Sequence, residues 1–182
     1  KNYLKLLAKR LKEFELKIFS RVDGICAMTK IDASEIKSLC GDVPIGIFPS
    51  GYQINTSESR KSGFTVENAL FHIASMDWQP NQEAIDWFLG EVWPLMIQKN
   101  KNAKSYLAGR EMPNRYNEMN LPGVNVVGEV AVAKEFYESK KIMIVPLLSG
   151  SGMRIKIIEG MAMGKVIVST SIGAEGIHVT HG

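Results

Sequence analysis

The first 21 residues repeat an apolar side chain every three or four positions, at Leu4, Leu7, Leu11, Phe14 and Ile18. This spacing predicts an amphipathic helix with one apolar stripe. The other faces of the helix carry seven Lys or Arg residues and two Glu residues. A solvated surface over a core-facing stripe explains the pattern, and a basic amphipathic helix lying on an anionic membrane is the alternative.

The next segment alternates short apolar runs with polar ones. An apolar run over 24–28 (GICAM) precedes a polar helix expected over 32–39, and a second run, IGIF, ends before Pro49. The stretch 49–63, PSGYQINTSESRKSG, is rich in Ser, Gly and charged residues. This composition predicts a linker.

A regular alternation of strands and helices begins after the linker. Apolar runs rich in β-branched residues predict strands over 69–75, 105–109, 124–128, 141–147 and 165–171. Helices are expected between them, over 82–98, 114–119, 131–139 and 153–163. Strands that are apolar throughout and alternate with helices indicate an α/β fold, with a parallel sheet covered on both faces. In such sheets ligands bind beyond the carboxyl ends of the strands, so functional residues are expected in the loops after them.

Composition excludes several classes of protein. The chain has 182 residues, of which 45% are hydrophobic, and a net charge of +3. The small charge and the lack of a basic stripe interleaved with aromatics give no reason to expect a nucleic-acid partner. No apolar run is long enough to span a membrane. The two cysteines, Cys26 and Cys40, lack metal-ligand spacing, which predicts no metal site and reduced thiols in a cytoplasmic protein.

The segment 145–164 carries the candidate chemistry. A strand is expected to end near Leu147, a loop of small residues follows over 149–152, and a helix begins after it. Backbone N–H groups of such a loop can approach an anion, and the helix N-terminus adds unpaired donors. Arg154 and Lys156 are expected in the first turn, where the helix dipole disfavours cations and no acidic residue compensates. The pattern predicts that a multiply charged anion, such as a diphosphate, binds there.

Glu159 extends this pattern by one turn. It lies three residues after Lys156, on the same face of the expected helix. A carboxylate can accept two hydrogen bonds, which suits the vicinal hydroxyls of a ribose, so the order of residues fits a nucleoside diphosphate. The alternative is structural: two solvated cations, with Glu159 paired to Lys156.

The segment 149–177, SGSGMRIKIIEGMAMGKVIVSTSIGAEGI, resembles the signature of family-4 (group 1) retaining glycosyltransferases. The segments ASMDWQPNQEAIDWF (74–88), FELKIFSRVDGICAMT (14–29) and IFPSGYQI (47–54) resemble other parts of that family. The resemblance implies the GT-B fold of two facing Rossmann-like domains, with the donor held by the second. It assigns residues 1–52 to the end of the first, acceptor-side domain, 53–66 to the linker and 67–182 to a nucleotide-sugar-binding domain truncated at its C-terminus.

The resemblance also implies an activity. A hexosyl or other glycosyl group would pass from a nucleotide-sugar to a glycan or lipid-linked acceptor with retention, without a metal or cofactor, in cell-surface polysaccharide synthesis. The protein would be cytoplasmic, with peripheral contact at the inner membrane face. The fragment alone is expected to bind donor without turnover. The alternatives are a degenerate, non-catalytic nucleotide-sugar-binding domain and a sugar-nucleotide epimerase of similar fold.

The family's site residues transfer onto matching positions. Arg154 and Lys156 would be the catalytic pair, holding the diphosphate and neutralising charge on the departing nucleoside diphosphate. Glu159 would hold the ribose. The remaining donor-binding positions flank these residues: Ser75, Met76 and Asp77 toward the phosphates, Gly128 and Glu129 near the base, Gly109 and Arg110 on the same rim, and the loop Gly150, Ser151 and Gly152.

Several positions depart from the family pattern: Pro80-Asn81 and Lys165-Val166 replace K-G and K-P pairs, and Ser151 and Gly160 differ within the motif. Ser151 replaces a glutamate that often contacts the donor sugar, and the N–H groups of Gly150 to Gly152 are expected to compensate. Gly160 replaces an alanine at a helix-propensity cost of about 1 kcal/mol, which predicts close approach by a ligand or a neighbouring strand. Outside the motif, His72 is predicted to be a core histidine. Trp78 is predicted to be a packing residue, and the alternative is that it flanks the donor pocket.

Overall fold

The computed structural model describes residues 2–53 and 66–180 and divides into two compact units. One unit combines the chain up to Gly51 with the segment from Gly176 onward, and the other runs from Tyr52 to Glu175. Most of the expected linker, residues 54–65, lies outside the described residues. The assignment of residues 1–52 and 67–182 to two domains of a longer protein stays a prediction.

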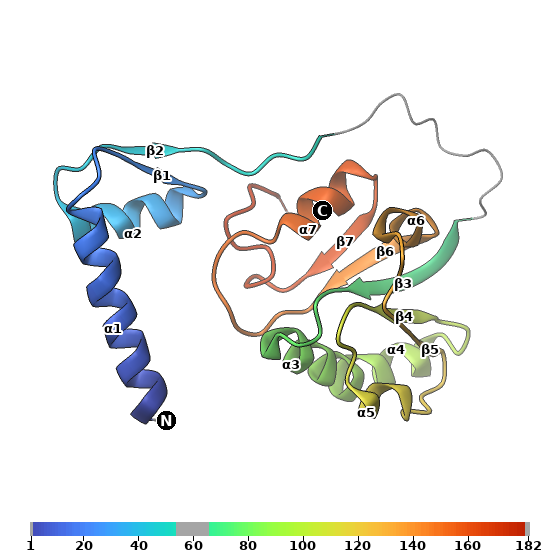
Figure 1. Cartoon of the computed structure of the whole chain (residues 1–182). Helices are drawn as coiled ribbons and strands as arrows, with labels where there is room; N and C mark the ends of the chain where they lie inside the picture. Colours follow the sequence, from blue (N-terminus) through green and yellow to red (C-terminus); the bar gives the residue numbers. More distant parts are fainter. Residues whose placement is uncertain (1, 54–65, 181–182) are drawn as a thin grey trace. The chain divides into compact units, whose positions relative to one another are not determined.

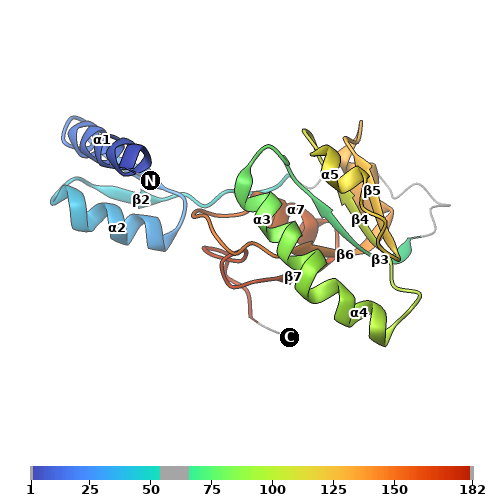
Figure 2. The ribbon, with the colours of Figure 1, turned by 90° about the horizontal axis from the view of Figure 1, so that it is seen from below.

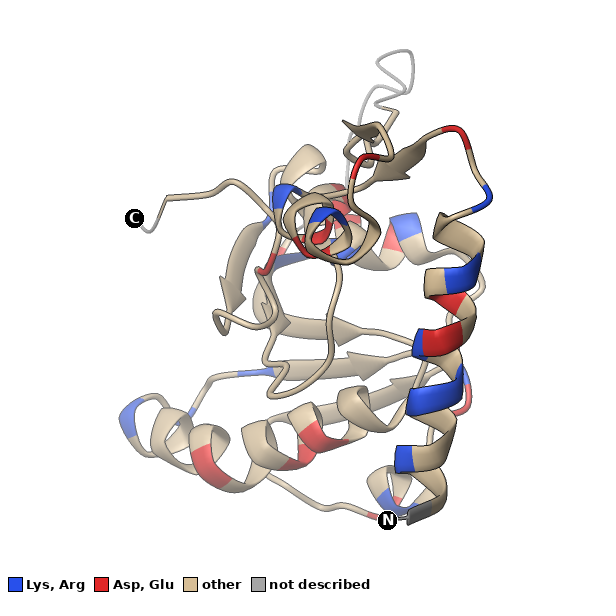
Figure 3. Cartoon of the chain, turned by 90° about the vertical axis from the view of Figure 1, so that its left-hand side faces the viewer, with Lys and Arg blue, Asp and Glu red and all other residues tan. Residues whose placement is uncertain are grey.

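The first unit contains α1 (Asn2–Phe19), β1 (Ile25–Ala27), α2 (Lys30–Cys40) and β2 (Ile45–Ile47). The two short strands pair in parallel. Thr29 caps α2, because its Oγ1 accepts a hydrogen bond from the Asp32 N–H at 3.0 Å. Basic side chains are spread along α1 (Figure 3), and its apolar stripe is 39–67% exposed. Both cysteines are free thiols.

The second unit is built on five parallel strands in the order β5-β4-β3-β6-β7. These are β3 (Glu67–Ile73), β4 (Ser105–Ala108), β5 (Val124–Gly128), β6 (Lys140–Val145) and β7 (Val166–Ser169). The helices are α3 (Gln79–Trp87), α4 (Trp93–Lys99), α5 (Asn114–Asn117), α6 (Ala133–Glu138) and α7 (Ile155–Ala162). Helices lie on both sides of the strands (Figure 1), which confirms the predicted Rossmann-like α/β fold.

The single helix expected over 82–98 is divided in the structure. A π-helical turn, Phe88–Val92, separates α3 from α4. Pro94 stands at the start of α4 and has no N–H with which to continue the α-helical ladder. α3 and α4 nevertheless follow one another along the same face of the sheet (Figure 2).

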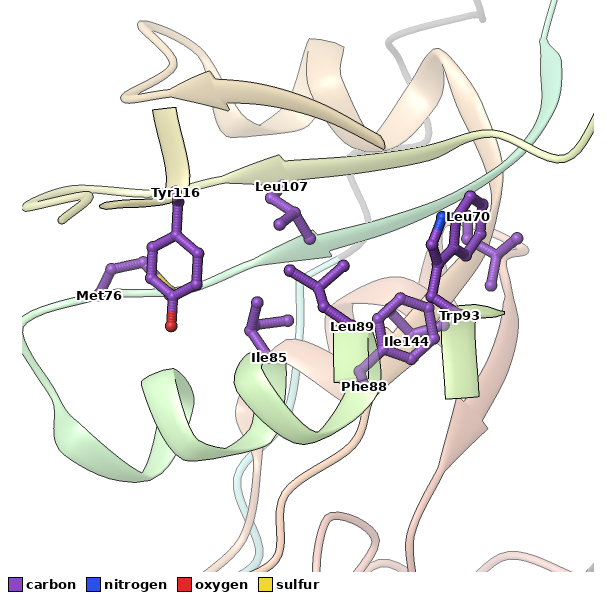
Figure 4. Close-up of a cluster of buried hydrophobic side chains, with 9 residues drawn as sticks. All are labelled: Leu70, Met76, Ile85, Phe88, Leu89, Trp93, Leu107, Tyr116 and Ile144. Atoms are coloured by element: carbon purple, nitrogen blue, oxygen red, sulfur yellow. The ribbon is translucent and has the colours of Figure 1, made fainter. Parts of the chain in front are cut away.

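The main core lies between the sheet and the α3–α4 layer (Figure 4). Strand residues Leu70, Leu107 and Ile144 pack there with side chains from the helices, namely Ile85, Phe88, Leu89, Trp93 and Tyr116. Trp93 is 2% exposed, and its Nε1–H donates to the Pro122 carbonyl at 3.0 Å. This core fixes β3, β4 and β6 as a rigid support for the loops at their carboxyl ends.

The opposite face of the sheet is covered by α6 and α7. Phe71 of β3 packs edge-on against Phe136 and Tyr137 of α6, with ring centroids 5.6 Å and 5.3 Å away. A Cβ on Gly160 of α7 would lie 2.9 Å from both Met143 Sδ of β6 and Ile167 Cδ1 of β7. Close approach of the neighbouring strands therefore accounts for the glycine in this helix.

Candidate functional site

The sheet order places a topological switch point between β3 and β6. β3 is followed along the chain by its neighbour β4 on one side, whereas β6 lies on its other side. In open α/β sheets such a point leaves a crevice outside the carboxyl ends of the two strands, where ligands bind. The loops that flank it, 74–78 after β3 and 146–154 after β6, both belong to the unit Tyr52–Glu175. α3 and α7 begin at this edge of the sheet (Figure 1).

The loop after β3 is tied down by protein hydrogen bonds. Asn81 Nδ2 donates to the Ser75 carbonyl at 2.8 Å, and Gln82 Nε2 donates to the Met76 carbonyl at 2.7 Å. The Met76 N–H donates to the Arg110 carbonyl at 2.9 Å. Since the Met76 side chain is also fully buried in the core, the structure gives this residue a packing role instead of the expected contact with phosphate. Ser75 stays half-buried at the crevice, with its Oγ 3.2 Å from Arg110 Nη2.

The ends of β4 and β5 continue the same edge of the sheet. Gly109 has φ +147°, and a Cβ there would lie only 1.7 Å from the Ala74 carbonyl oxygen, so only glycine permits this contact between loops. Its N–H donates to the Gly128 carbonyl at 2.8 Å. Gly128 and the exposed Glu129 therefore lie on the expected edge, but β4 separates their strand from β3.

The loop after β6 contains two glycines with positive φ angles. Gly150 and Gly152 have φ of +107° and +87°, values that favour glycine. Among the described residues, the N–H groups of Gly150, Ser151 and Gly152 donate to no protein acceptor. Three backbone donors in a loop before a helix form the kind of cradle that binds anions.

Arg154 lies at the N-cap of α7 and not inside the first turn, because the helix begins at Ile155, two residues later than expected. Its Nη1 donates to the carbonyls of Ser151 at 2.5 Å and Gly152 at 2.8 Å. The Nε and Nη2 atoms are buried and have no hydrogen-bond partner in the described part of the chain. The guanidinium carbon lies 5.6 Å from the centroid of the Trp78 ring. Nη1 of the guanidinium is thus hydrogen-bonded to its own loop, whereas the Nε–Nη2 edge has no acceptor among the described residues.

Lys156 is the second residue of α7, and its Nζ lies 3.5 Å from the Ile73 carbonyl oxygen. Burial, and next the positive charge of Arg154, lower the pKa of Lys156 to about 8. None of the salt bridges within the described residues includes either cation. The site therefore holds two cations without a protein carboxylate partner, which an anionic ligand would stabilise.

Glu159 lies one turn further along α7 and is half-buried. It forms no salt bridge with Lys156, so the structural alternative considered from the sequence is not what the structure shows. Its charge contributes, after burial, to a raised pKa of Tyr137. The carboxylate has no hydrogen-bond partner in the described ranges and stays available to a ligand.

His72 is a core residue, as the sequence predicts. It is 1% exposed, and its Nδ1 lies 3.0 Å from the Ile144 carbonyl oxygen, which places the ring proton on Nδ1. Burial, and then the Lys156 charge, lower the pKa of His72 to about 3, so the ring is neutral near pH 7. The sequence does not link His72 to Lys156, because their proximity depends on the packing of α7.

Two kinds of feature are absent from the described residues, a cluster of potential metal ligands and a membrane-spanning helix. Within residues 2–53 and 66–180, no group of three or more His, Cys, Asp or Glu side chains is placed to hold a metal ion. In the same ranges, no helix is long and apolar enough to cross a membrane.

Comparison with known proteins adds independent information. The sequence model of a family described as Glycosyl transferases group 1 matches residues 67–182. An uncharacterized 44.6 kDa protein in the cps region of Klebsiella pneumoniae is 28% identical, and the match covers 63% of this chain and 32% of that protein.

Solved structures share the fold. The crystal structure of TarM matches with a TM-score of 0.70 at 18% identity, over 87% of this chain and 31% of TarM. A variant of S. aureus TarM, solved with Fondaparinux, alpha-GlcNAc-glycerol and UDP, matches with a TM-score of 0.69 at 16% identity, over 88% of this chain and 32% of that one. Anabaena HepE, solved with UDP and glucose, matches with a TM-score of 0.68 at 15% identity, over 93% of this chain and 50% of HepE. The chain spans 31–50% of the length of these proteins.

Proposed function

Because the chain belongs to the family of group 1 glycosyl transferases, we propose that it binds the nucleoside diphosphate of a nucleotide-sugar donor at the crevice between β3 and β6. The whole protein would transfer the sugar to a glycan or lipid-linked acceptor. The crystals of the TarM variant and of HepE contain UDP, which supports a nucleotide-sugar donor for this chain as well.

The unpaired edge of the Arg154 guanidinium carries this proposal. Its Nε and Nη2 are buried without a partner among the described residues, at a position where the N–H groups of residues 150–152 are also free. Buried donors without acceptors are rare in native proteins and call for an explanation. A phosphate group explains them, because its oxygens accept two parallel hydrogen bonds from one guanidinium edge.

The other residues have roles that follow from their places. Lys156 would add a second positive charge beside Arg154, and together they would stabilise the negative charge that develops on the departing diphosphate. Glu159, one turn along α7, would accept hydrogen bonds from the ribose. Ser75 would face the phosphates from the loop after β3. No residue in this scheme needs a bound metal or cofactor.

Finer features of the activity rest on the family resemblance. We include retention at the anomeric carbon, transfer of a hexosyl group and a role in cell-surface polysaccharide synthesis, with which the cps-region relative agrees. The site would act in the cytoplasm. Donor binding without turnover is proposed for the 182-residue chain by itself, because it covers only 31–50% of the length of the matched solved structures.

Peripheral membrane contact is a further part of the proposal. The apolar stripe of α1 is exposed and flanked by Lys and Arg side chains (Figure 3), an arrangement that suits an anionic bilayer surface. Co-sedimentation with vesicles containing anionic lipid tests it, and sedimentation that persists when Leu7 and Leu11 are changed to Ser would count against it.

Ser151 supports a second candidate function, that of a nucleotide-sugar-binding domain without catalytic activity. It stands where many relatives have a glutamate, and its side chain is exposed. Transfer of a labelled sugar by the full-length protein would exclude this candidate. Donor binding without transfer by that protein would support it.

Calorimetry with UDP, GDP, ADP and CMP, in the presence of EDTA, is the first test. Stabilisation by one nucleoside diphosphate that disappears in Arg154→Ala would support both the ligand class and its position. A ligand present at about 100 times its Kd raises the unfolding free energy by roughly 2.7 kcal/mol. Absence of any response from folded full-length protein would overturn the proposal.

A further inference from the structure

Trp78 covers the Arg154 guanidinium from the opposite side of the crevice. The indole follows the loop after β3 and stands at the N-cap of α3, whereas Arg154 stands at the N-cap of α7. The guanidinium carbon lies 5.6 Å from the ring centroid, within the range of a cation–π contact. The ring keeps 42% of its surface exposed, so packing in the core does not account for its place.

Gly150 is what allows this approach. A Cβ on Gly150 would lie 2.9 Å from Arg154 Nη2 and 3.0 Å from Cη2 of Trp78. Its φ of +107° is also one that a residue with a side chain rarely adopts. The two loops therefore meet at one glycine, and the indole and the guanidinium both lie where its side chain would be.

The contact fixes the edge that the guanidinium presents. Nη1 donates to the carbonyls of Ser151 and Gly152, and the indole lies 5.6 Å from the guanidinium carbon. The Nε–Nη2 edge then remains as the unpaired, buried pair of donors within the described part of the chain. A free arginine side chain has several rotatable bonds, and the like charge of Lys156 would otherwise repel it. Holding the group before the ligand arrives lowers the entropy lost on binding.

We infer that Trp78 is a positioning residue for phosphate recognition, which holds Arg154 with its Nε–Nη2 edge directed to the diphosphate. The inference rests on the proposed function, because it concerns the same site. Trp78 acts through Arg154, so its contribution depends on the guanidinium being present. Direct stacking of the indole on a nucleotide base is the competing possibility, and it predicts no such dependence.

A double-mutant cycle on the whole chain separates these cases. Affinity is measured by calorimetry, with UDP, GDP and ADP as probes, for the wild type, Trp78→Leu, Arg154→Ala and the combination of the two. We expect Trp78→Leu to weaken binding of the tightest of the three probes roughly 3- to 10-fold, the cost of ordering one long side chain on binding. In the Arg154→Ala background, the same change should alter affinity about twofold or less, because the partner is gone.

Two more variants make the cycle specific. Trp78→Phe retains an aromatic face, so it should recover most of the affinity that Trp78→Leu loses. It also keeps the test available if the leucine variant does not fold. Leu95→Ala is the control: Leu95 is 60% exposed, has no aromatic ring and lies in α4, outside the loops that flank the crevice. Its affinity should equal that of the wild type.

The outcomes distinguish the inference from the proposed function. An equal loss from Trp78→Leu in both backgrounds would overturn the inference in favour of direct stacking. Unchanged affinity in Trp78→Leu, together with a loss in Arg154→Ala, would also overturn it and leave the proposed function standing. Wild-type protein that binds none of the diphosphates would overturn both.

Discussion

Two cations contact aromatic rings at opposite ends of β6, and they differ in whether their donors are used. Lys140 begins the strand, 7% exposed, with its Nζ 4.3 Å from the Tyr106 ring centroid and 4.2 Å from that of Phe136. The same Nζ donates to Ser139 Oγ at 2.9 Å. Arg154 follows the carboxyl end of the strand and faces Trp78, but its Nε and Nη2 have no partner in the described residues.

The difference shows how one type of contact serves two purposes. At the amino edge of the sheet the ammonium group is surrounded by rings, and it stabilises the fold. At the carboxyl edge the ring covers one face of the guanidinium and leaves an edge unpaired. The unpaired donors are at the edge where α/β folds bind ligands. The two cation–π contacts therefore differ in their expected role, because only Arg154 has buried donors without an acceptor in the described residues.

Replacing Arg154 by alanine should have the largest effect on binding. Loss of charge-assisted hydrogen bonds should weaken nucleoside diphosphate binding by roughly 1.5–3 kcal/mol. The free energy of unfolding should change little, because the side chain bonds only to carbonyls of its own loop. Calorimetry and urea denaturation measure the two quantities. Loss of stability without loss of affinity would make Arg154 a structural residue.

Replacing Lys140 by alanine should give the opposite pattern. The change removes a buried side chain that contacts two rings, so we expect the free energy of unfolding to fall by about 2 kcal/mol. Affinity for the nucleotide should stay at the wild-type value, because Lys140 is at the other end of β6. Urea denaturation and calorimetry on one preparation check both statements. A Lys140→Ala protein with weakened binding and full stability would remove the contrast between the two edges.

The fold could be predicted because its signals are local. The apolar run of β6 and the glycine-terminated helix α7 are both visible in the sequence, and both form at the expected places. The predicted element boundaries are wrong where packing between distant parts of the chain determines the backbone conformation. α7 begins at Ile155 because Arg154 has an extended backbone and Gly152 before it has φ +87°. The π-helical turn before Pro94 divides a helix whose periodicity is continuous.

The site could be predicted only in part. The order of Arg154, Lys156 and Glu159 in one segment predicts a nucleoside diphosphate as the ligand, because spacing along a helix determines which side chains share a face. Sequence alone could not reveal that Met76 turns into the core, since the direction of a loop side chain depends on its packing. The Trp78–Arg154 contact joins two distant loops through Gly150, and no local pattern encodes it.

The pH dependence of binding gives the smallest of the predicted effects. The pKa of Lys156 is lowered to about 8, so its ammonium group loses its proton in the free protein as the pH rises past that value. His72, which lies near Lys156, has a pKa of about 3 and therefore stays neutral in this range. Affinity for the diphosphate should therefore be level up to about pH 7.5 and fall several-fold by pH 9. In Lys156→Arg, which keeps its charge, the fall should disappear.

The free energy of unfolding should rise with pH where the affinity falls, which gives a second test that Lys156 is the titrating group. A lysine whose pKa is lowered by folding binds fewer protons in the folded state than in the unfolded state, between pH 8 and 10.5. The free energy of unfolding gains from this group as the pH rises through that window, because the cost of burying the ammonium is relieved. Lys156→Met should be more stable than the wild type at pH 7, and the difference should shrink toward pH 10. Denaturation at both pH values measures it, and an equal difference at the two would assign the loss of affinity above pH 8 to another group.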